Sequence, residues 1–273
     1  MRKILITGAT ALGFASLVSA QTSVTLDFGG SGNTLAATGF DSVLNEDNTA
    51  YNVAGGVLSM ITRSGDIFGN YENDPDVAKN IFSSNLEMTA GTIMDAHVTV
   101  SGLNVNFHGG GIWMGLDTDH YIRLGVINVN TNLVVEGIRE NEDLWNDPGS
   151  GHNGPGGDIV GIQSGSLGPT PQVGSLEFDL RLIRSGTDVS AFYQVGGGGY
   201  VSLGTFNDFR TVGGGFTEGS QLMVGVYAFG GPDQQDPATF DFDSFSASAV
   251  PEPASMLALG IGALAMLRRR KGR

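Results

Sequence analysis

The chain has 273 residues and no cysteine, with 14 basic against 28 acidic side chains. Seven of the basic residues lie within the first three or the last six positions, so residues 4–267 carry a net charge of about −21. This strongly acidic part of the chain lacks the lysine and arginine side chains that neutralise phosphate groups, which excludes nucleic-acid binding. Without disulfides, a hydrophobic core or a metal ion must hold the fold, and a body of about 230 residues is large enough for one such core.

The first 20 residues have the layout of a secretory signal peptide. Arg2 and Lys3 precede an uncharged, mainly apolar run that ends in the small residues Val18-Ser19-Ala20. A basic start, an apolar middle and a small-residue end are together typical of a segment that the Sec translocon accepts and signal peptidase removes. The mature chain is therefore predicted to begin at Gln21.

Residues 21–249 have the pattern of an antiparallel sheet protein. Short segments rich in β-branched and aromatic residues alternate with turn-forming Gly, Asn and Asp, as in "YIRLGVINV", "SLEFDLRLIRSG", "QLMVGVYAF" and "TFDFDSFSASA". Many short strands joined by such turns predict an all-β fold, an antiparallel β-sandwich. The alternation assigns to its core Leu180, Leu182, Val224, Val226, Phe240 and Phe242.

Two longer phrases resemble a known class of secreted domains. They are "GGGIWMGLDTDHYIRLGVI" and "LRLIRSGTDVSAFYQVGGGGYVSLGTF", which together span much of residues 109–206. They are similar to the hairpins of concanavalin A-like, laminin-G-like jelly rolls in bacterial proteins. The resemblance implies two packed antiparallel sheets and a range of functions from glycan binding and adhesion to glycoside hydrolysis.

No catalytic pattern stands out in the body of the chain. The laminarinase-like branch of the jelly rolls places acidic residues on one strand as E-x-D-x-x-E, and this spacing is absent. The chain has no cysteine nucleophile, and its histidines His97, His108, His120 and His152 lack HExxH spacing. We therefore expect a protein without enzymatic activity, and a glycoside hydrolase or lyase on the same fold is the alternative.

Aromatic side chains outside the core are the candidates for a glycan surface, because sugar rings stack on exposed aromatic rings. Trp145 follows the acidic phrase "RENEDL" in a polar loop, with His152 and Asn153 as neighbours, and these three form the predicted glycan site. Trp113, inside an apolar strand, is expected in the core, and Arg123 is expected to form a structural ion pair. Further aromatic candidates are Tyr121, Tyr193 and Tyr200.

A structural calcium ion is the predicted cofactor. Calcium takes six to eight oxygen ligands, largely from carboxylates and carbonyls. Asp27 lies in the first predicted strand, and Asp241 and Asp243 lie in the last. Because the terminal strands of a jelly roll are commonly neighbours, these carboxylates are expected to meet there, with ordinary surface acidity as the alternative.

The last 24 residues, "VPEPASMLALGIGALAMLRRRKGR", contain three elements in a fixed order. Pro251, Glu252 and Pro253 precede an uncharged run from Ala254 to Leu267, which Arg268, Arg269 and Arg270 follow. The run is shorter than the roughly 20 residues of a full transmembrane helix, and the arginines fit the cytoplasmic side. The segment is therefore predicted to be a short transmembrane helix that spans a bilayer only marginally.

This tail resembles the PEP-CTERM sorting signal of Gram-negative bacteria. In that family an exosortase, a membrane-embedded cysteine transpeptidase, recognises the motif and removes the helix. The resemblance implies an exported chain that passes through an inner-membrane intermediate to the cell surface or extracellular matrix. Such proteins usually accompany exopolysaccharide, so a polysaccharide is an expected partner and the body is expected to bind carbohydrate or to serve as a structural matrix component.

Overall fold

The computed structural model describes residues 21–65, 78–87, 91–116, 120–141, 160–168, 174–207, 221–230 and 236–250. The predicted signal peptide and residues 251–273, which include Pro251, Glu252, Pro253, Arg268, Arg269 and Arg270, lie outside this part of the chain. Among the residues just given, no helix has the length and apolar character needed to span a membrane.

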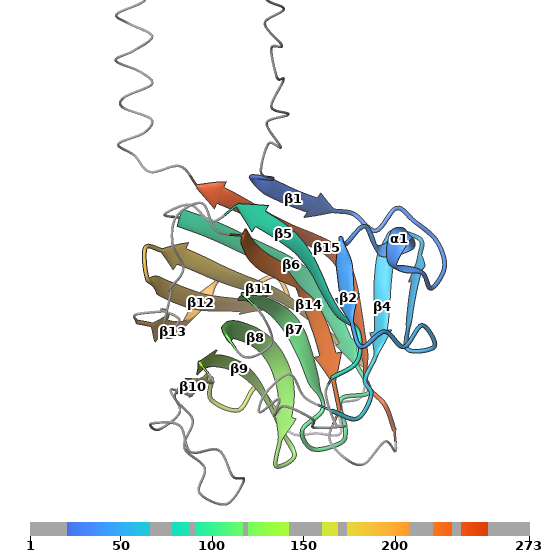
Figure 1. Cartoon of the computed structure of the whole chain (residues 1–273). Coiled ribbons are helices and arrows are strands. Elements are labelled where there is room, and N and C mark those ends of the chain that lie inside the picture. Colours follow the sequence, from blue (N-terminus) through green and yellow to red (C-terminus); the bar gives the residue numbers. More distant parts are fainter. Residues whose placement is uncertain are drawn as a thin grey trace, which may run out of the picture.

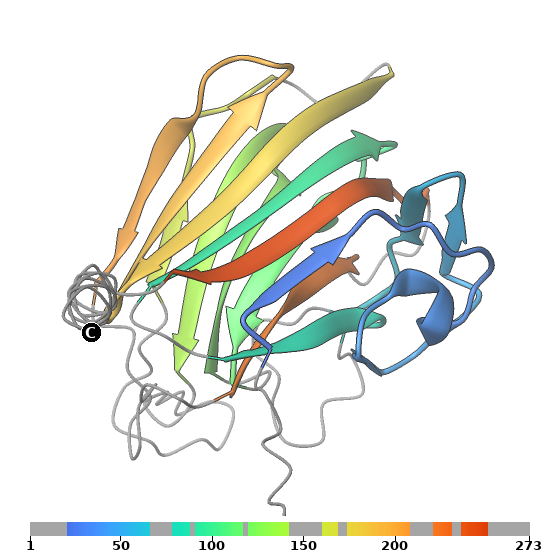
Figure 2. The same ribbon diagram turned by 90° about the horizontal axis from the view of Figure 1, so that it is seen from above.

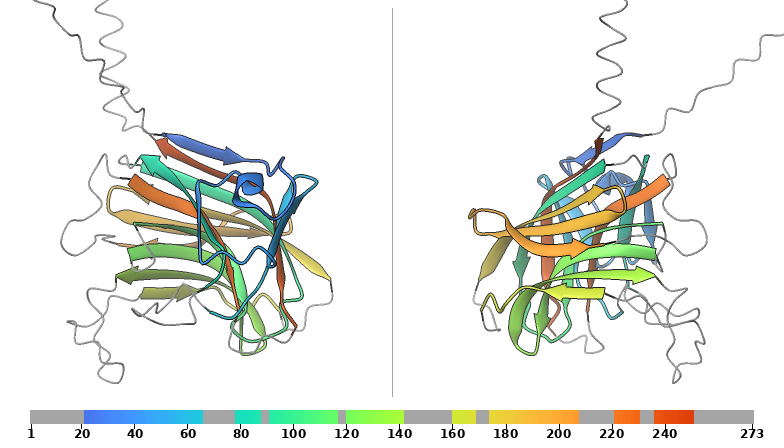
Figure 3. Two further views of the ribbon diagram at one scale, coloured as in Figure 1. Left: turned by 45° about the vertical axis from the view of Figure 1, so that its right-hand side comes forward. Right: turned by 90° about the vertical axis from the view of Figure 1, so that its left-hand side faces the viewer.

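Two antiparallel sheets lie face to face and form a sandwich, as the strand pattern predicts (Figures 2 and 3). Within the described ranges, the first sheet has eight strands, of which seven follow one another in space. In spatial order they are β13 (Val201–Phe206), β12 (Asp188–Val195), β11 (Ser175–Ser185), β6 (Gly91–Ser101), β15 (Thr239–Val250), β4 (Val57–Ile61) and β3 (Tyr51–Ala54). The eighth, β1 (Ser23–Leu26), pairs with the second half of β15.

The second sheet has seven strands in the part of the chain that the structure describes. In spatial order they are β10 (Val160–Gln163), β9 (Asn132–Asn141), β8 (His120–Val129), β7 (Gly109–Gly115), β14 (Gln221–Phe229), β5 (Ile81–Glu87) and β2 (Ser42–Leu44). The described residues contain one short helix, α1 (Leu35–Thr38), which lies near β4 and β2 (Figure 1). The first and last strands are neighbours, as expected, because β1 pairs with β15 from Ser23 opposite Ser248 to Leu26 opposite Phe245.

The core lies between the sheets and follows the period of two that a half-buried strand imposes. In β6 and β11, alternate side chains point inward and the others outward. All six predicted core residues, including Phe240 and Phe242, are fully buried. After Phe242 the alternation breaks, since a bulge at Asp243 and Ser244 inserts one residue and Phe245 becomes the next inward side chain.

The outer face of the seven-stranded sheet carries a second cluster of buried side chains. It includes Trp113, Tyr121, Tyr227 and Phe229. Trp113 is buried as expected but lies on the side of β7 that faces away from the main core, and its Nε1 donates a hydrogen bond to the carbonyl of Phe82 at 3.0 Å. Gly125 leaves room for this layer, because a Cβ there would lie 2.5 Å from the Tyr227 hydroxyl oxygen.

Replacement of Phe242 by Ala tests the core assignment. The side chain is fully buried between the sheets, so its loss should lower the free energy of unfolding by about 3 to 5 kcal/mol. Urea unfolding of the two proteins measures this difference. The matched change Val201→Ala, at a side chain that is 49% exposed, should leave the midpoint nearly unchanged. A Phe242→Ala midpoint equal to that of the unchanged protein would contradict the inward position.

Candidate functional site

The outer face of the eight-stranded sheet carries a group of interacting charged and aromatic side chains. It arises from the alternation of β6 and β11, because the residues between the inward core positions must point to the opposite face. We call this group the charged face, and its members are Asp95, His97, Asp179, Arg181, Tyr200 and Asp243.

His97 lies between two carboxylates that come from the neighbouring strands. Its Nδ1 is 2.7 Å from Oδ1 of Asp179 in β11, and its Nε2 is 3.7 Å from Oδ2 of Asp243 in β15. Burial lowers the pKa of His97, but the hydrogen bond to Asp179 and the charges of Asp243, Asp179 and Glu177 outweigh it. The net effect is a raised pKa, so the protonated imidazole is favoured at this position.

Arg181 joins a carboxylate to an exposed aromatic ring. Its Nε donates a hydrogen bond to Oδ1 of Asp95 at 2.5 Å, and its Cζ lies 4.3 Å from the centroid of the Tyr200 ring. The hydrogen bond to Asp95 raises the pKa of Arg181 despite partial burial. Burial and the charge of Asp95 also raise the pKa of Tyr200, whose residue surface is still 40% exposed. The guanidinium is therefore held in a fixed orientation beside a ring that solvent reaches.

This arrangement offers a ligand three kinds of contact on one surface. The carboxylates accept hydrogen bonds, the Arg181 guanidinium donates them, and Tyr200 presents an aromatic ring. None of these side chains is fully buried. The charged face is thus suited to a molecule with many hydroxyl groups and a ring that can lie on tyrosine.

The predicted glycan residues Trp145, His152 and Asn153 lie outside the described part of the chain. The segment that contains them follows Asn141 at the end of β9 and precedes Val160, which pairs with Arg139. Of the further aromatic candidates, Tyr121 and Tyr193 are buried, and Tyr200 belongs to the charged face. The predicted aromatic set therefore contributes one exposed ring to a described site.

The three predicted calcium ligands do not come together as one group. Asp243 lies on the charged face, and Asp241 lies opposite Thr99 of β6 with its Oδ1 buried and without a hydrogen-bond partner. Asp27 follows β1, and its Oδ1 accepts a hydrogen bond from the Gly29 amide at 3.2 Å. Within the described ranges, no set of three His, Asp or Glu side chains could hold a metal ion. The calcium ion stays a prediction from the sequence.

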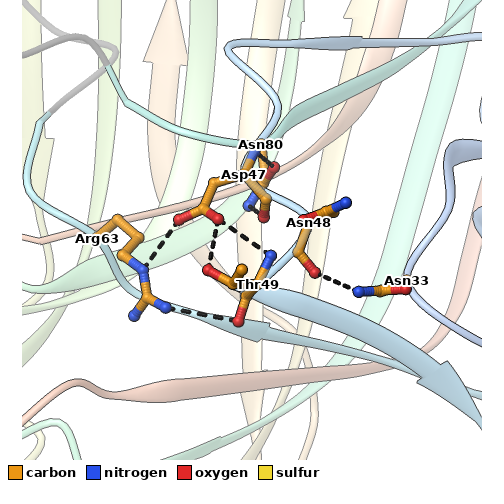
Figure 4. A network of polar contacts seen from close by, with 6 residues as sticks. All are labelled: Asn33, Asp47, Asn48, Thr49, Arg63 and Asn80. Carbon is orange, nitrogen blue, oxygen red and sulfur yellow. Dashed lines mark hydrogen bonds and ion pairs between the residues drawn. The ribbon is translucent and has the colours of Figure 1, made fainter.

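A second polar network, around Asp47, is structural (Figure 4). Its Oδ1 accepts hydrogen bonds from the Thr49 amide and hydroxyl, its Oδ2 accepts one from Arg63 at 3.1 Å, and the Asn80 amide side chain bonds to its backbone. The hydroxyl of Thr49 is the main cause of a lowered pKa at Asp47. Both carboxylate oxygens are already used, so this network fixes the connection between β2 and β3.

Arg123 forms the predicted ion pair inside the second cluster. Its guanidinium nitrogen lies 3.2 Å from Oε1 of Glu136, and its Cζ lies 4.7 Å from the centroid of the Phe229 ring. The residue is only 2% exposed. These groups are buried, so a polymer in solution cannot reach them as it can reach the charged face.

One family model matches the chain, that of the PEP-CTERM protein-sorting motif, at residues 249–271. The match confirms the sorting signal that the tail resembles. It indicates an exported protein that exosortase processes at the membrane and that is displayed outside the cell. No curated protein sequence is significantly similar to the chain.

Several solved structures have a similar fold at low sequence identity. The GH43 protein BlXynB from Bacillus licheniformis has a TM-score of 0.58 and 17% identity over 83% of this chain and 39% of its own. The Bacteroides ovatus protein titled "Xyloglucan PUL GH43B" has a TM-score of 0.57 and 18% identity over 84% of this chain and 39% of its own. Alginate lyase Aly36B has a TM-score of 0.51 and 12% identity over 85% of this chain and 99% of its own.

These likenesses show a shared β-sandwich fold. The chain spans 39% of the length of the two GH43 proteins, less than half of each. The narrower resemblance to laminin-G-like domains stays a prediction from the sequence. What the comparisons establish is a β-sandwich that carries a PEP-CTERM sorting motif.

The raised pKa of His97 makes part of the stability depend on pH. A raised folded-state pKa contributes stability that is fully present below the ordinary value near 6.5 and is lost as the pH rises through the folded pKa. Asp179→Asn should therefore cost more stability at about pH 5.5 than at about pH 8.5. Urea unfolding at the two pH values measures the difference.

The change Asp236→Asn, at an exposed residue that precedes β15, serves as the control and should show no such dependence. An equal cost of Asp179→Asn at both pH values would mean that a charged His97 adds nothing to the stability of this face.

Proposed function

We propose that the sandwich binds a polysaccharide of the cell surface or extracellular matrix through the charged face. The sorting motif supports the location, since an exosortase substrate is exported and displayed where such polymers accumulate. A structural role within the exopolysaccharide matrix follows from the same binding. This function requires no chemical reaction at the site.

The exposed Tyr200 ring, fixed by Arg181 and Asp95, is the observation that carries the proposal. Aromatic rings that pack against a sugar need a stable orientation and open surface, and Tyr200 has both. Asp95 and Asp179 lie near this ring, and His97 and Asp243 continue the charged face across β6 and β15, where they can bond to hydroxyl groups. Stacking positions the ring of the sugar, and the polar groups select its hydroxyls.

Charge limits the class of polysaccharide. Between its two basic ends the chain carries a net charge of about −21. The charged face itself has more carboxylates than cations. A polymer of uronic acids or sulfated sugars would be repelled at low ionic strength. We therefore propose a neutral polysaccharide as the ligand.

The alternative is a glycoside hydrolase or lyase on the same fold. The names of the structural neighbours supply the reason to keep it, because two are GH43 proteins and one is an alginate lyase. Their identities of 12 to 18% carry no catalytic residue over to this chain. Incubation with polysaccharides separates the two functions, since only an enzyme releases new reducing ends or unsaturated products.

Tyr200→Ala tests the binding function. Loss of the ring should weaken binding to a neutral polysaccharide by about 2- to 10-fold, the range expected for one stacking contact. Affinity electrophoresis in gels that contain soluble neutral glucans, xylans or mannans gives the dissociation constants. Phe107→Ala is the matched control, because Phe107 is 50% exposed and lies outside the charged face.

Equal affinities of the Tyr200→Ala and unchanged proteins would contradict a role for this face. Stronger retention by an anionic than by every neutral polymer would contradict the ligand class.

A further inference from the structure

The sorting motif and the fold share residues. The family match begins at Ala249, whereas β15 continues to Val250, one residue beyond the domain boundary that the sequence predicts. Pro251 follows at once, and because proline has no amide hydrogen it cannot extend the ladder. Ala249 and Val250 therefore belong both to a paired strand and to the segment that the sorting-motif model matches.

The end of β15 is held from both sides. Val250 pairs with Gly91 and Ala249 with Thr92 of β6. On the other side, the Ala249 amide donates a hydrogen bond to the Thr22 carbonyl at 2.8 Å, next to the start of β1. Figure 1 shows β15 ending beside the start of β1. The strand thus reaches Pro251 without any unpaired residue before it.

Little chain separates this sheet end from the apolar run. Only Pro251, Glu252 and Pro253 lie between Val250 and Ala254, and three extended residues span about 10 Å. While the apolar run is held in a bilayer, the sandwich must lie close to the membrane surface. An enzyme that cuts there must bind an accessible chain on both sides of the bond. On the amino-terminal side, that chain consists of Pro251–Pro253 at most and is then β15.

We propose that the folded sandwich controls access to the sorting site. The sorting enzyme engages its site only when the last pairs of β15, from Ser248 to Val250, have separated from β1 and β6. Separation of these three residues would leave the core intact, because Ala247 is the last side chain of β15 in the core and Val250 is 40% exposed. The separation is therefore a local opening of the sheet. The proposal depends on the sorting motif and is independent of carbohydrate binding.

A disulfide across the sheet end provides the test. A Cβ on Gly91 would lie 3.2 Å from the Val250 Cβ, near the 3.5 to 4.5 Å of disulfides, so Gly91→Cys with Val250→Cys can be bridged. The chain has no other cysteine, so no competing bridge can form within it. In the native host, the oxidised double variant should accumulate as signal-cleaved precursor that retains residues 254–273. A membrane-permeant reductant should restore processing.

Three controls distinguish access from other effects. The single variants Gly91→Cys and Val250→Cys show whether either substitution alone disturbs recognition. Ser101→Cys with Thr239→Cys joins the same two strands at their other end, since these residues are paired, and should be processed as the unchanged protein is. Pulse labelling followed by intact-mass analysis gives the processed fraction for each protein.

A longer connection gives the opposite prediction. A ten-residue Gly/Ser segment after Val250, followed by a second Ala-Val before Pro251, keeps the motif intact and moves it away from the sheet. Processing should become several-fold faster. Normal processing of the oxidised Gly91→Cys/Val250→Cys protein, or an unchanged or slower rate with the inserted segment, would overturn the proposal.

Discussion

The pairing of β6 with both of its neighbours is the interaction on which the rest of the molecule depends. Over its whole length, from Gly91 to Ser101, β6 is bonded to β11 on one side and to β15 on the other. One face of this three-stranded centre supplies core residues such as Met94 and Val98. The other supplies Asp95 and His97 of the charged face. A chain without disulfides thus uses the same strands for stability and for its candidate site.

Much of this fold could be predicted from the sequence because a period of two assigns the side chains of a half-buried strand to opposite faces. Phe240 and Phe242 follow that rule. Periodicity does not reveal whether side chains on the outer face of a sheet are also buried. The sequence therefore predicts that Trp113 is buried, but not that it lies on the outer face of the seven-stranded sheet. The bulge at Asp243 likewise has no signal in the alternation of "FDFDSF" until the partner strand is known.

The charged face shows why the candidate site was harder to predict. His97 and Asp179 are 82 positions apart, and only the register of β6 with β11 makes them neighbours. Tyr200 was a candidate by its residue type, yet its contact with Arg181 depends on the hairpin that returns β13 beside β12. The tail differs, because its signal lies in contiguous residues and needs no tertiary structure to be read. The cellular location of the protein could therefore be predicted from the sequence more fully than the residues of its candidate binding site.

Chemical-shift mapping tests the central claim, that the charged face binds a neutral polysaccharide, most directly. The exported protein, labelled with ¹⁵N, is titrated with oligosaccharides of the neutral polymer that retains it best. The account predicts that the largest amide shifts occur at Asp95 and His97 of β6, at Asp179 and Arg181 of the neighbouring β11, and at Tyr200, which directly precedes β13. Shifts confined to other residues, or no shift with any neutral oligosaccharide, would contradict it.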